Sequence, residues 1–433
     1  MKTFTEVIEY LYARLPMFTR DGASAINPDV DKTLLFCEAL GNPQQQFKSI
    51  HIAGTNGKGS TSHMMASVFA ASGYKTGLYT SPHLVDFRER IRIDGQMMPE
   101  QRVIEFINDH LALIEEIKPS FFEVTVAMAF DFFAKEKVDI AIIEVGLGGR
   151  LDSTNIINPE LCMITNIGMD HMNILGDTLE EIAGEKAGII KPNTPVVISE
   201  RQESIQHVFV EKAKENNAPL YFANDYYQVD GLERKADGLH LSITNKADNS
   251  EKSWHLDLAG GYQQKNILGV LCAIDQLRAM GFNLSEEQVA YGLSHVQDST
   301  GLRGRWQTLS TSPWIICDTG HNEDGIREVL ANLATLSYEK LHFVFGAMKD
   351  KDLSHILPQL PKDAIYYFAA PDMPRAMPAD QLKELAATFG LQGQSYPSIS
   401  AAFLAAKEAS KEKELIFIGG STFVVADVLT NHF

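Results

Sequence analysis

Cysteine is scarce in this chain, and no apolar run is long enough to cross a membrane. The 433 residues include four widely separated cysteines: Cys37, Cys162, Cys272 and Cys317. None forms a C-x-x-C pair, which argues against a disulfide framework or a zinc ribbon and favours a reducing compartment. The most apolar stretch, residues 121–133, is interrupted by Glu123 and Asp131 and is too short for a transmembrane helix. Residues 1–16 mix acidic and apolar side chains and predict an amphipathic helix rather than a signal peptide, so a cytoplasmic protein is expected.

Positive charge is also in deficit. The chain has 38 Lys and Arg residues against 56 Asp and Glu, a formal net charge of −18. This balance opposes unspecific binding to nucleic acid or to an anionic membrane, and we expect neither as a partner. An anionic ligand would therefore need a local binding device. The remaining composition, 45% hydrophobic and 22% charged, is ordinary for a globular protein and argues against disordered and fibrous classes.

Short apolar runs that alternate with helical periods indicate an α/β fold. Residues 49–54 form such a run, and residues 60–73 follow it with apolar side chains at helical spacing. Residues 140–143 are apolar without alternation, as expected for a strand that is buried on both faces of a parallel sheet. The repeated strand-then-helix order predicts a doubly wound parallel sheet.

Changes in composition and hydrophobic pattern along the chain suggest two domains. Residues 221–258 contain short alternating runs joined by Asp-Gly and Asn-Ser turns, which predict a β-rich insertion. Residues 296–306 are rich in Gly, Arg, Ser and Thr and predict a linker, after which the strand-helix alternation begins again. We expect an N-terminal domain over residues 1–297 and a smaller α/β domain over residues 298–433.

The strongest local motif is AGTNGKGSTS, residues 53–62, between a predicted strand and a predicted helix. Glycines allow backbone N–H groups to approach phosphate, the helix N-terminus adds positive potential, and Lys58 supplies a point charge. Gly59 separates Lys58 from Ser60, so the motif departs from the usual G-x-x-x-x-G-K-[ST] pattern. A Gly-rich turn without a ligand is the alternative.

Three polar residues follow other predicted strands. Glu144 ends the buried run DIAIIE, Ser81 lies in TSPHL, and His171 lies in GMDHM. Parallel sheets bind ligands at the carboxyl ends of their strands, where Glu144 could hold the Mg²⁺ of a nucleotide. A structural role, such as capping or ion pairing, is the alternative for each residue.

Lys186 occupies an unexpected position. Thr178 and Glu181 predict a capping box, and Pro192 ends the helical run. On this helix Lys186 shares a face with Leu179, Ile182 and Ala183, which places an amine on the buried side. Spacing alone favours a lysine whose stem packs while its ammonium reaches solvent.

The motifs GTNGKGS, YTSPHL, IEVGLGGRLDSTN, ITNIGMDH, GEKAGIIKP, GRW and DTGHN together resemble the Mur ligase superfamily. The resemblance is greatest to folylpolyglutamate synthases and bifunctional dihydrofolate/folylpolyglutamate synthases, and it runs in order from about residue 15 to residue 346. It implies an ATP-dependent amide ligase with a P-loop domain and a smaller, Rossmann-like glutamate-ligase domain, its active site lying in the cleft between them. The stretch after Gly346 matches only loosely.

The resemblance also implies roles for individual residues. The ATP-binding residues would be Thr55, Asn56, Gly57, Lys58, Gly59, Ser60, Asn266, Arg305 and Asp318. The metal ligands would be Ser81, Glu144 and His171. The pterin- or folate-binding residues would be Phe122, Glu123, Val124, Thr125, Leu151, Asp152 and Ser153, with residues 15–18 closing over them.

Two residues would serve catalysis. Lys186 matches a lysine that family members carry as a carbamate, which reverses the interpretation from spacing. His321 would position the phosphoryl group or the attacking amine. It lies in Asp318-Thr-Gly-His-Asn-Glu323, where the family often has D-G-A-H-N-P, so the shape of this loop is less certain.

The implied reaction joins L-glutamate to dihydropteroate, to a folate, or to both. The acceptor's carboxylate attacks the γ-phosphate of ATP, with Lys58 and Mg²⁺ neutralising charge, and the amine of glutamate then displaces phosphate from the acyl phosphate. Mg²⁺ is the implied cofactor, and a cytoplasmic monomer is expected.

Three other functions fit the sequence less well. A peptidoglycan-precursor Mur ligase usually has a nucleotide-sugar domain before the phosphate loop, but only 53 residues precede Gly54 here. A regulatory P-loop NTPase would turn over ATP without pteroate, folate or glutamate. A degenerate nucleotide-binding module is disfavoured because Lys58, Glu144, His171 and Lys186 are all present.

Overall fold

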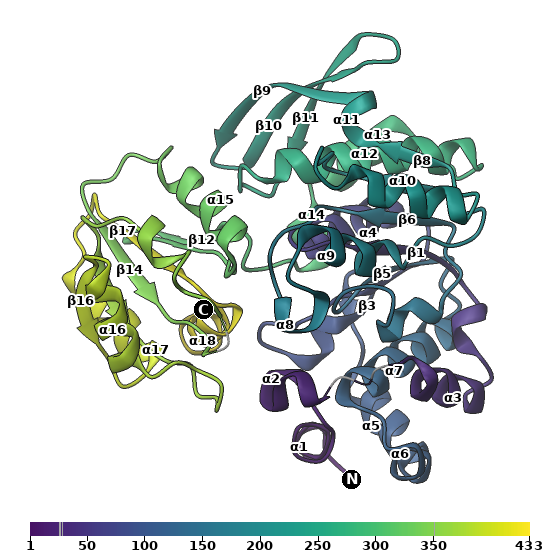
Figure 1. Cartoon of the computed structure of the whole chain (residues 1–433), viewed down its shortest axis with the longest axis horizontal. Coiled ribbons are helices and arrows are strands. Elements are labelled where there is room, and N and C mark those ends of the chain that lie inside the picture. The colour runs from purple at the N-terminus through teal and green to yellow at the C-terminus, as the bar shows by residue number, and fades with distance from the viewer. Residues whose placement is uncertain (26, 28, 350) are drawn as a thin grey trace. The chain divides into compact units, whose positions relative to one another are not determined.

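The computed structural model describes residues 1–25, 27, 29–349 and 351–433. These residues form two compact units, coloured by chain position in Figure 1. Unit 1 comprises Met1–Asp257 and Gln263–Leu302, and unit 2 comprises Leu258–Tyr262 and Arg303–Phe433. The sequence placed the boundary after residue 297, which lies inside helix α14 (Val296–Thr300) of unit 1.

Unit 1 is built on an eight-stranded sheet among the described residues. In spatial order its strands are β4 (Gln96–Met97), β3 (Ile91–Ile93), β2 (Thr76–Tyr79), β5 (Ile140–Glu144), β1 (Lys48–Ala53), β6 (Leu161–Ile164), β7 (Val196–Ile198) and β8 (Leu220–Phe222). From β2 to β8 the strands are parallel, whereas β3 and β4 form an antiparallel edge. Residues of β5 and β6 are fully buried, as the unbroken apolar runs predict.

Helices cover both faces of this sheet. The helices of unit 1 other than α14 are α1 (Phe4–Arg14), α2 (Phe18–Asp21), α3 (Asp31–Ala39), α4 (Lys58–Ala71), α5 (Glu100–Asp109), α6 (Leu111–Ile117), α7 (Phe121–Glu136), α8 (Met172–Leu175), α9 (Leu179–Ala187), α10 (Gln206–Glu215), α11 (Ala223–Tyr226), α12 (Gln263–Ala279) and α13 (Glu286–Leu293). On one face, α7 packs on Ala141 and Ile143 of β5, and α9 and α10 cover β6 and β7. On the other face, α4 packs against β2 and β5, and α12 packs against β6 and β7.

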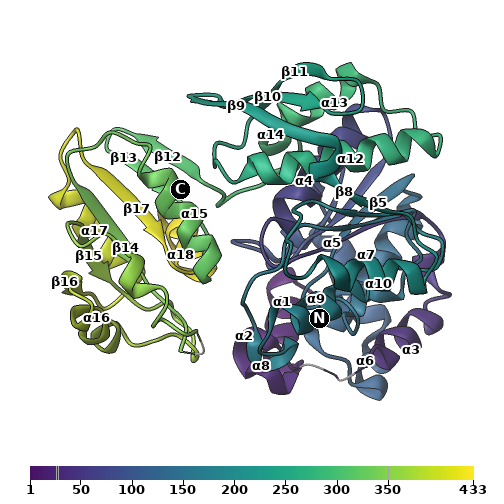
Figure 2. The same cartoon turned by 45° about the horizontal axis from the view of Figure 1, so that its top comes forward.

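A separate three-stranded antiparallel sheet confirms the predicted β-rich insertion. It consists of β9 (Tyr227–Lys235), β10 (Gly238–Asn245) and β11 (Ser250–Leu256), with β10 in the centre. Leu239, Leu241 and Ile243 of β10 are buried, while the alternate residues face outward. The sheet packs against α12 and α13, as Figure 2 shows.

In the part of unit 2 that the structure describes, the strands form a six-stranded sheet. In spatial order its strands are β12 (Gln307–Thr311), β13 (Trp314–Cys317), β17 (Leu415–Gly419), β14 (Leu341–Phe345), β15 (Ile365–Phe368) and β16 (Gln392–Ser395), and its helices are α15 (Glu323–Leu333), α16 (Ala379–Thr388), α17 (Ile399–Ala409) and α18 (Thr422–His432). All strands are parallel except β12. Apolar residues of α15 and α16 share one core with β14 and β17, and α17 and α18 also pack on the sheet.

These two units confirm the predicted fold class: a parallel-sheet P-loop unit with a β-rich insertion, and a smaller Rossmann-like α/β unit. Among the described helices, none has both the length and the apolar character that a bilayer-spanning segment needs.

Candidate active site

The order of strands in unit 1 gathers four loops at one edge of the sheet. Because β2, β5, β1 and β6 are neighbours and parallel, their carboxyl ends lie side by side. Ser81 follows β2, Glu144 ends β5, the Gly54 loop follows β1, and Thr165 follows β6. This edge is where open α/β sheets bind ligands.

The loop between β1 and α4 is held closely against the loop after β6. A Cβ atom on Gly54, which has φ +148°, would lie 1.8 Å from Oγ1 of Thr165, so only glycine fits there. The side chain of Asn166 accepts a hydrogen bond from the N–H of Asn56 at 2.9 Å. Thr55 bonds to both the N–H and the carbonyl of Gly168 through its hydroxyl, at 2.9 and 3.2 Å. These contacts hold the phosphate-loop backbone in one shape.

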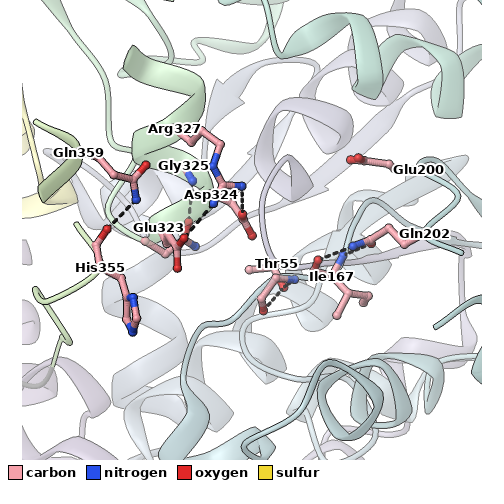
Figure 3. Close-up of polar contacts among 12 residues, drawn as sticks. Thr55, Ile167, Glu200, Gln202, Glu323, Asp324, Gly325, Arg327, His355 and Gln359 are labelled. Atoms are coloured by element: carbon pink, nitrogen blue, oxygen red, sulfur yellow. Dashed lines mark hydrogen bonds and ion pairs between the residues drawn. The ribbon is translucent and has the colours of Figure 1, made fainter. Parts of the chain in front are cut away.

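The loop after β6 is itself braced from the next strand. The amide of Gln202 accepts from the N–H of Ile167 and donates to its carbonyl, both at 2.8 Å. Figure 3 shows Gln202 turned toward Ile167, and Thr55 with its polar contacts. The support of the phosphate loop thus extends over two further loops.

Helix α4 begins at Lys58, directly after Gly57 in the left-handed conformation at φ +86°. Lys58 Nζ donates to the carbonyls of Gly54 and Thr55, at 3.1 and 3.2 Å, so the ammonium lies over its own loop. A Cβ atom on Gly57 would meet Oδ1 of Asn266 at 2.3 Å. The predicted ATP-binding residue Asn266, far away in sequence, therefore lies against the phosphate loop.

The start of α12 also contacts the start of α4. Gln263 donates from Nε2 to the hydroxyl of Ser60 at 3.0 Å, and Asn266 donates to Oε1 of Gln263 at 2.7 Å. Gln263 is fully buried, and Asn266 and Ser60 are nearly so. Gly59 lies next to them in the first turn of α4.

Lys186 is buried beneath the phosphate loop. The predicted capping box of Thr178 and Glu181 is confirmed at the start of α9. The side chain of Lys186 is 4% exposed, and its Nζ donates to the carbonyl of Gly54 at 3.0 Å. The ammonium therefore does not reach solvent, and the interpretation from spacing alone was wrong.

Burial strongly favours the uncharged form of this amine. Burial, reinforced by the nearby Lys58 ammonium and partly opposed by Asp170 and Asp152, lowers the pKa of Lys186 to about 7. A buried lysine that is neutral near physiological pH is a nucleophile rather than a counter-ion.

The metal-ligand candidates differ in how directly the structure links them. The N–H of Ser81 donates to Oε2 of Glu144 at 3.2 Å, so these two residues are adjacent. Glu144 is 4% exposed at the end of β5. His171 lies at the start of α8 with φ +51°, and its ring contacts the ring of Phe18 at 5.5 Å. Phe18 ends the segment 15–18 that was predicted to close over the acceptor.

Of the predicted acceptor-binding residues in α7, Phe122 approaches the strand ends. A Cβ atom on Gly146, two residues after Glu144, would lie 2.3 Å from the Phe122 ring. Glu123 instead caps α7, accepting from the N–H of Ser120 at 2.5 Å. Val124 is fully buried in the core, and Thr125 donates its hydroxyl to a backbone carbonyl of the same helix.

Asp152 organises the loop that contains the other acceptor-binding candidates. Its carboxylate accepts from the N–H of Leu147 at 2.8 Å and from the N–H and hydroxyl of Thr154 at 3.0 and 2.5 Å. Burial raises its pKa, while these hydrogen bonds favour the charged form. Ser153 is buried beside it, whereas Leu151 is 37% exposed.

The predicted residues of unit 2 gather after β13. Asp318 is 3% exposed and accepts from Tyr262 Oη at 2.7 Å, from the N–H of Trp306 at 2.8 Å and from the N–H of Gly320 at 2.7 Å. Arg305 donates to the hydroxyl of Thr319. His321 contacts the carbonyl of Thr319 through Nδ1 at 3.0 Å. Burial raises the pKa of Asp318, so its ionised form depends on these donors.

Several supporting residues were missed at the sequence level. Asn166 lies in the ITNIG motif and His83 in the YTSPHL motif, but neither was singled out. Arg90 donates to Nδ1 of His83 at 2.7 Å, and burial lowers the pKa of His83 to about 3, which leaves a neutral acceptor. Tyr12 of α1 contacts the other ring nitrogen at 3.2 Å. The signal for His83 was its place directly after a strand; Gln263 had no comparable signal.

Comparison with known proteins agrees with this geometry. A model of the Mur ligase middle domain matches residues 52–274, and a model of the Mur ligase glutamate ligase domain matches residues 304–422. Over 93% of its length the chain is 32% identical to the dihydrofolate synthase/folylpolyglutamate synthase of Bacillus subtilis, of which it covers 94%. The chain belongs to the folylpolyglutamate synthase/dihydrofolate synthase family of Mur ligases.

Solved structures of this family share the whole fold. The complex of E. coli FolC with DHPP and ADP has a TM-score of 0.84 at 28% identity, covering 99% of this chain and 97% of that one. A bifunctional folylpolyglutamate synthase/dihydrofolate synthase with Mn, AMPPNP and L-glutamate bound has a TM-score of 0.82 at 27% identity, covering 99% and 98%. Membership of the folylpolyglutamate synthase/dihydrofolate synthase family confirms the predicted activity, ATP-dependent ligation of glutamate in folate synthesis and polyglutamylation. The bound Mn supports a divalent-metal requirement.

Proposed function

We propose that this ligase accepts both dihydropteroate and reduced folates, adding L-glutamate to each through an acyl phosphate. The observation that carries the acyl-phosphate chemistry is the convergence of two lysines, Lys58 and Lys186, on the carbonyl of Gly54, at the same sheet edge as the carboxylate of Glu144. The bifunctional name of the Bacillus subtilis relative and the DHPP in the E. coli complex support two acceptors.

The phosphate loop would hold the triphosphate of ATP. The N–H groups of residues 55–60 belong to the loop before α4 and to its first turn, and the helix dipole adds positive potential there. Lys58, now bonded to two carbonyls of its own loop, would turn to the β- and γ-phosphates when ATP binds. Asn266 would contact the nucleotide from α12, since it already touches Gly57.

Mg²⁺ is the proposed resident ion, held by Ser81, Glu144 and His171. The donor chemistry of Ser81 and Glu144 fits, because hydroxyl and carboxylate oxygens suit a hard cation and the two residues are adjacent. When bound, the ion would neutralise charge that develops on the transferring phosphoryl group. His171 would supply an imidazole nitrogen as the third donor.

Lys186 would act as a carbamate. A neutral amine can attack CO₂, forming an N–C bond as one C–O π bond opens and releasing one proton. The buried amine thereby becomes an anionic carbamate. The fully buried setting and the pKa of about 7 support this step. The anion would then lie beside Lys58, whose ammonium it stabilises near the phosphates.

The acceptor would bind along Phe122 and the loop of residues 151–153. Phe122 offers an aromatic face next to Gly146, and the backbone shaped by Asp152 offers hydrogen-bonding groups. Glu123, Val124 and Thr125 would shape this site from within α7 rather than contact the acceptor through their ends. Residues 15–18 would cover it, since Phe121 N–H already bonds to the carbonyl of Pro16 at 2.9 Å.

Unit 2 would contribute Arg305, Asp318 and His321. Arg305 would bind phosphate oxygens, Asp318 would position the nucleotide through the loop it organises, and His321 would orient the phosphoryl group or the amine of glutamate. We also propose a monomeric, cytoplasmic enzyme; the four cysteines are free and buried, as a reducing compartment allows.

The test is a pair of ligation assays with dihydropteroate and tetrahydrofolate, each with ATP, Mg²⁺ and L-glutamate. We expect both acceptors to give glutamylated product and one ADP per amide bond. Product from one acceptor alone would contradict dual specificity, and ATP turnover independent of acceptor would contradict the ligase mechanism. Lys58→Ala should abolish ligation, whereas the control Lys413→Ala, at a lysine with 78% side-chain exposure, should not.

A further inference from the structure

The outer face of the three-stranded sheet carries a cluster of metal-binding side chains outside the ligase site. Among the described residues, one group of three His, Cys, Asp or Glu side chains brings its ligand atoms within 4.8 Å of one another: Asp237, His240 and His255. None of these residues belongs to the ATP, acceptor or glutamate machinery. We propose that they bind one divalent ion of the zinc class.

Strand register places the two histidines side by side. His240 of β10 and His255 of β11 are direct cross-strand partners, and their rings stack at 4.6 Å with an interplanar angle of 16°. Both face outward, because Leu239 and Leu241 on either side of His240 are buried. Cross-strand partners on one sheet face keep a fixed separation, so the pair is preorganised without a flexible loop.

Asp237, in the turn between β9 and β10, completes the donor set. Its Oδ1 lies 3.1 Å from Nε2 of His240, and its Oδ2 lies 3.5 Å from Nε2 of His255. Zinc ligands at about 2.0–2.1 Å from the ion in a tetrahedron are about 3.3 Å from each other. The two Asp–His separations are close to those edges, and all three ligand atoms lie within 4.8 Å of one another, so binding requires the side chains to draw together around the ion.

The chemistry of these donors selects the class of ion. Two imidazoles and one carboxylate suit Zn²⁺, Co²⁺ or Ni²⁺ and are a poor set for Mg²⁺, which demands oxygen ligands. Three protein ligands leave one position for water. The side chains are 34% exposed for His240, 32% for His255 and 58% for Asp237, so an ion can enter directly from solvent.

Surrounding charge does not oppose the ion. Glu233 of β9 is the cross-strand partner of His240 on the other side and adds a second carboxylate to the same row. Lys235 forms an ion pair with Glu233 at 3.2 Å, so the positive charge of Lys235 is balanced by that carboxylate. In the absence of metal, the histidines bond to Asp237, and its pKa is lowered mainly by the hydrogen bond from His240.

The site has a structural consequence for the chain. Strand β11 ends at Leu256, one residue before the chain leaves unit 1 after Asp257. An ion shared by Asp237, His240 and His255 would cross-link the β9–β10 turn to this exit. We therefore expect zinc to protect amides of β10 and β11 from hydrogen exchange, leaving the strands of the eight-stranded sheet unaffected.

The test is a zinc titration of the tag-free full-length protein in excess Mg²⁺, in competition with a chromophoric chelator. We expect one tight equivalent of Zn²⁺ in the wild type, at least 30-fold weaker binding in His240→Gln/His255→Gln, and about tenfold weaker binding in Asp237→Asn. His355→Gln is the matched control. His355 pairs with Asp352 at the same i,i+3 spacing, with 3.9 Å between the charged atoms, but it does not belong to a group of three ligand residues among the described residues. Its zinc affinity should equal that of the wild type.

The proposal would be overturned if the double variant bound Zn²⁺ as tightly as the wild type, or if excess Mg²⁺ displaced the bound Zn²⁺ from the wild type. It would also be overturned if His355→Gln weakened Zn²⁺ binding as much as the double variant does. Circular dichroism checks that the double variant is folded. If the double variant does not fold, two experiments that keep both histidines decide the question: Zn²⁺ binding by Asp237→Asn, and hydrogen exchange of β10 and β11 in the wild type. Exchange rates that zinc leaves unchanged in the wild type would refute the cross-link.

Discussion

The depressed pKa of Lys186 gives a quantitative prediction for carbamate formation. With a pKa of about 7, in place of the usual value of 10.5, about three-quarters of the amine is neutral at pH 7.5. An ordinary lysine at that pH is neutral in about one molecule in a thousand. Burial beneath Gly54 therefore raises the reactive fraction several-hundred-fold, and we expect Lys186 to take up CO₂ where exposed lysines do not.

The perturbation is removal of CO₂ and bicarbonate, followed by their return as ¹³C-bicarbonate. We expect ligation to fall on removal and to recover on addition, with a carbamate resonance in the ¹³C spectrum of the wild type. Lys186→Met should lack both the resonance and the recovery. Lys191→Met is the control, because Lys191 is another lysine whose pKa burial lowers, and it should retain both. Small carboxylic acids should partly rescue Lys186→Ala.

The same shift predicts a pH dependence of stability. Lowering the pKa from 10.5 to about 7 corresponds to about 5 kcal/mol of disfavoured charging. Between about pH 7 and pH 10.5 the unfolded chain binds a proton at this lysine that the folded chain does not. The free energy of unfolding should therefore rise with pH over this window, by up to about 1.4 kcal/mol per unit.

Urea denaturation in CO₂-free buffer at pH 7, 8 and 9 measures this slope. Lys186→Met should show a smaller slope than the wild type, whereas Lys413→Met should not. Equal slopes in the wild type and Lys186→Met would refute the depressed pKa. Absence of a ¹³C carbamate signal in active wild type, or its persistence in Lys186→Met, would refute the carbamate.

Three further predictions follow from the strand ends and the exit from the inserted sheet. Glu144→Gln should leave the protein folded but lower the ligation rate at least 100-fold, because a metal-binding carboxylate is lost; near-normal rates at saturating Mg²⁺ would contradict this. Gly57→Ala should weaken ATP binding more than tenfold, because its Cβ would meet Asn266 at 2.3 Å, while Gly73→Ala, with similar φ but nothing within 4 Å, should bind ATP normally in calorimetry. Burial raises the pKa of Asp257 to about 6, so between about pH 4 and pH 6 the folded chain binds a proton at Asp257 that the unfolded chain does not. The free energy of unfolding should therefore fall as the pH rises through this range. Asp257→Asn should flatten this fall in urea titrations, and an unchanged fall would exclude Asp257 as its cause.

Local patterns predicted much of the fold because each pattern reports a short-range requirement. The apolar run at residues 140–143 became the fully buried β5, and the turn-rich stretch at residues 221–258 became β9 to β11. The first half of the expected linker, residues 296–306, is instead helical: Val296–Thr300 forms α14, which packs against α4. Polar composition does not distinguish a short helix from a linker when tertiary packing stabilises the helix.

Sequence position says more about which candidate residues lie together where they follow strands than where they lie on helices, and the roles of these residues stay predictions. Glu144 and the phosphate loop share one edge of the sheet, since parallel strands end together. Glu123 illustrates the opposite case. Ser120 and Glu123 form an S-x-x-E capping box, a signal that was present in the sequence and accounts for its carboxylate as part of the helix start.

The sequence by itself determined the family, the phosphate loop and the face of α9 that carries Lys186, because motif and periodicity are properties of neighbouring residues. Only the tertiary structure decided that Nζ of Lys186 ends beneath Gly54, and that Asn266 touches Gly57. Both contacts join residues more than a hundred positions apart. The pKa of Lys186 depends on the water excluded by all the elements packed around it, and no local pattern in the chain encodes that exclusion.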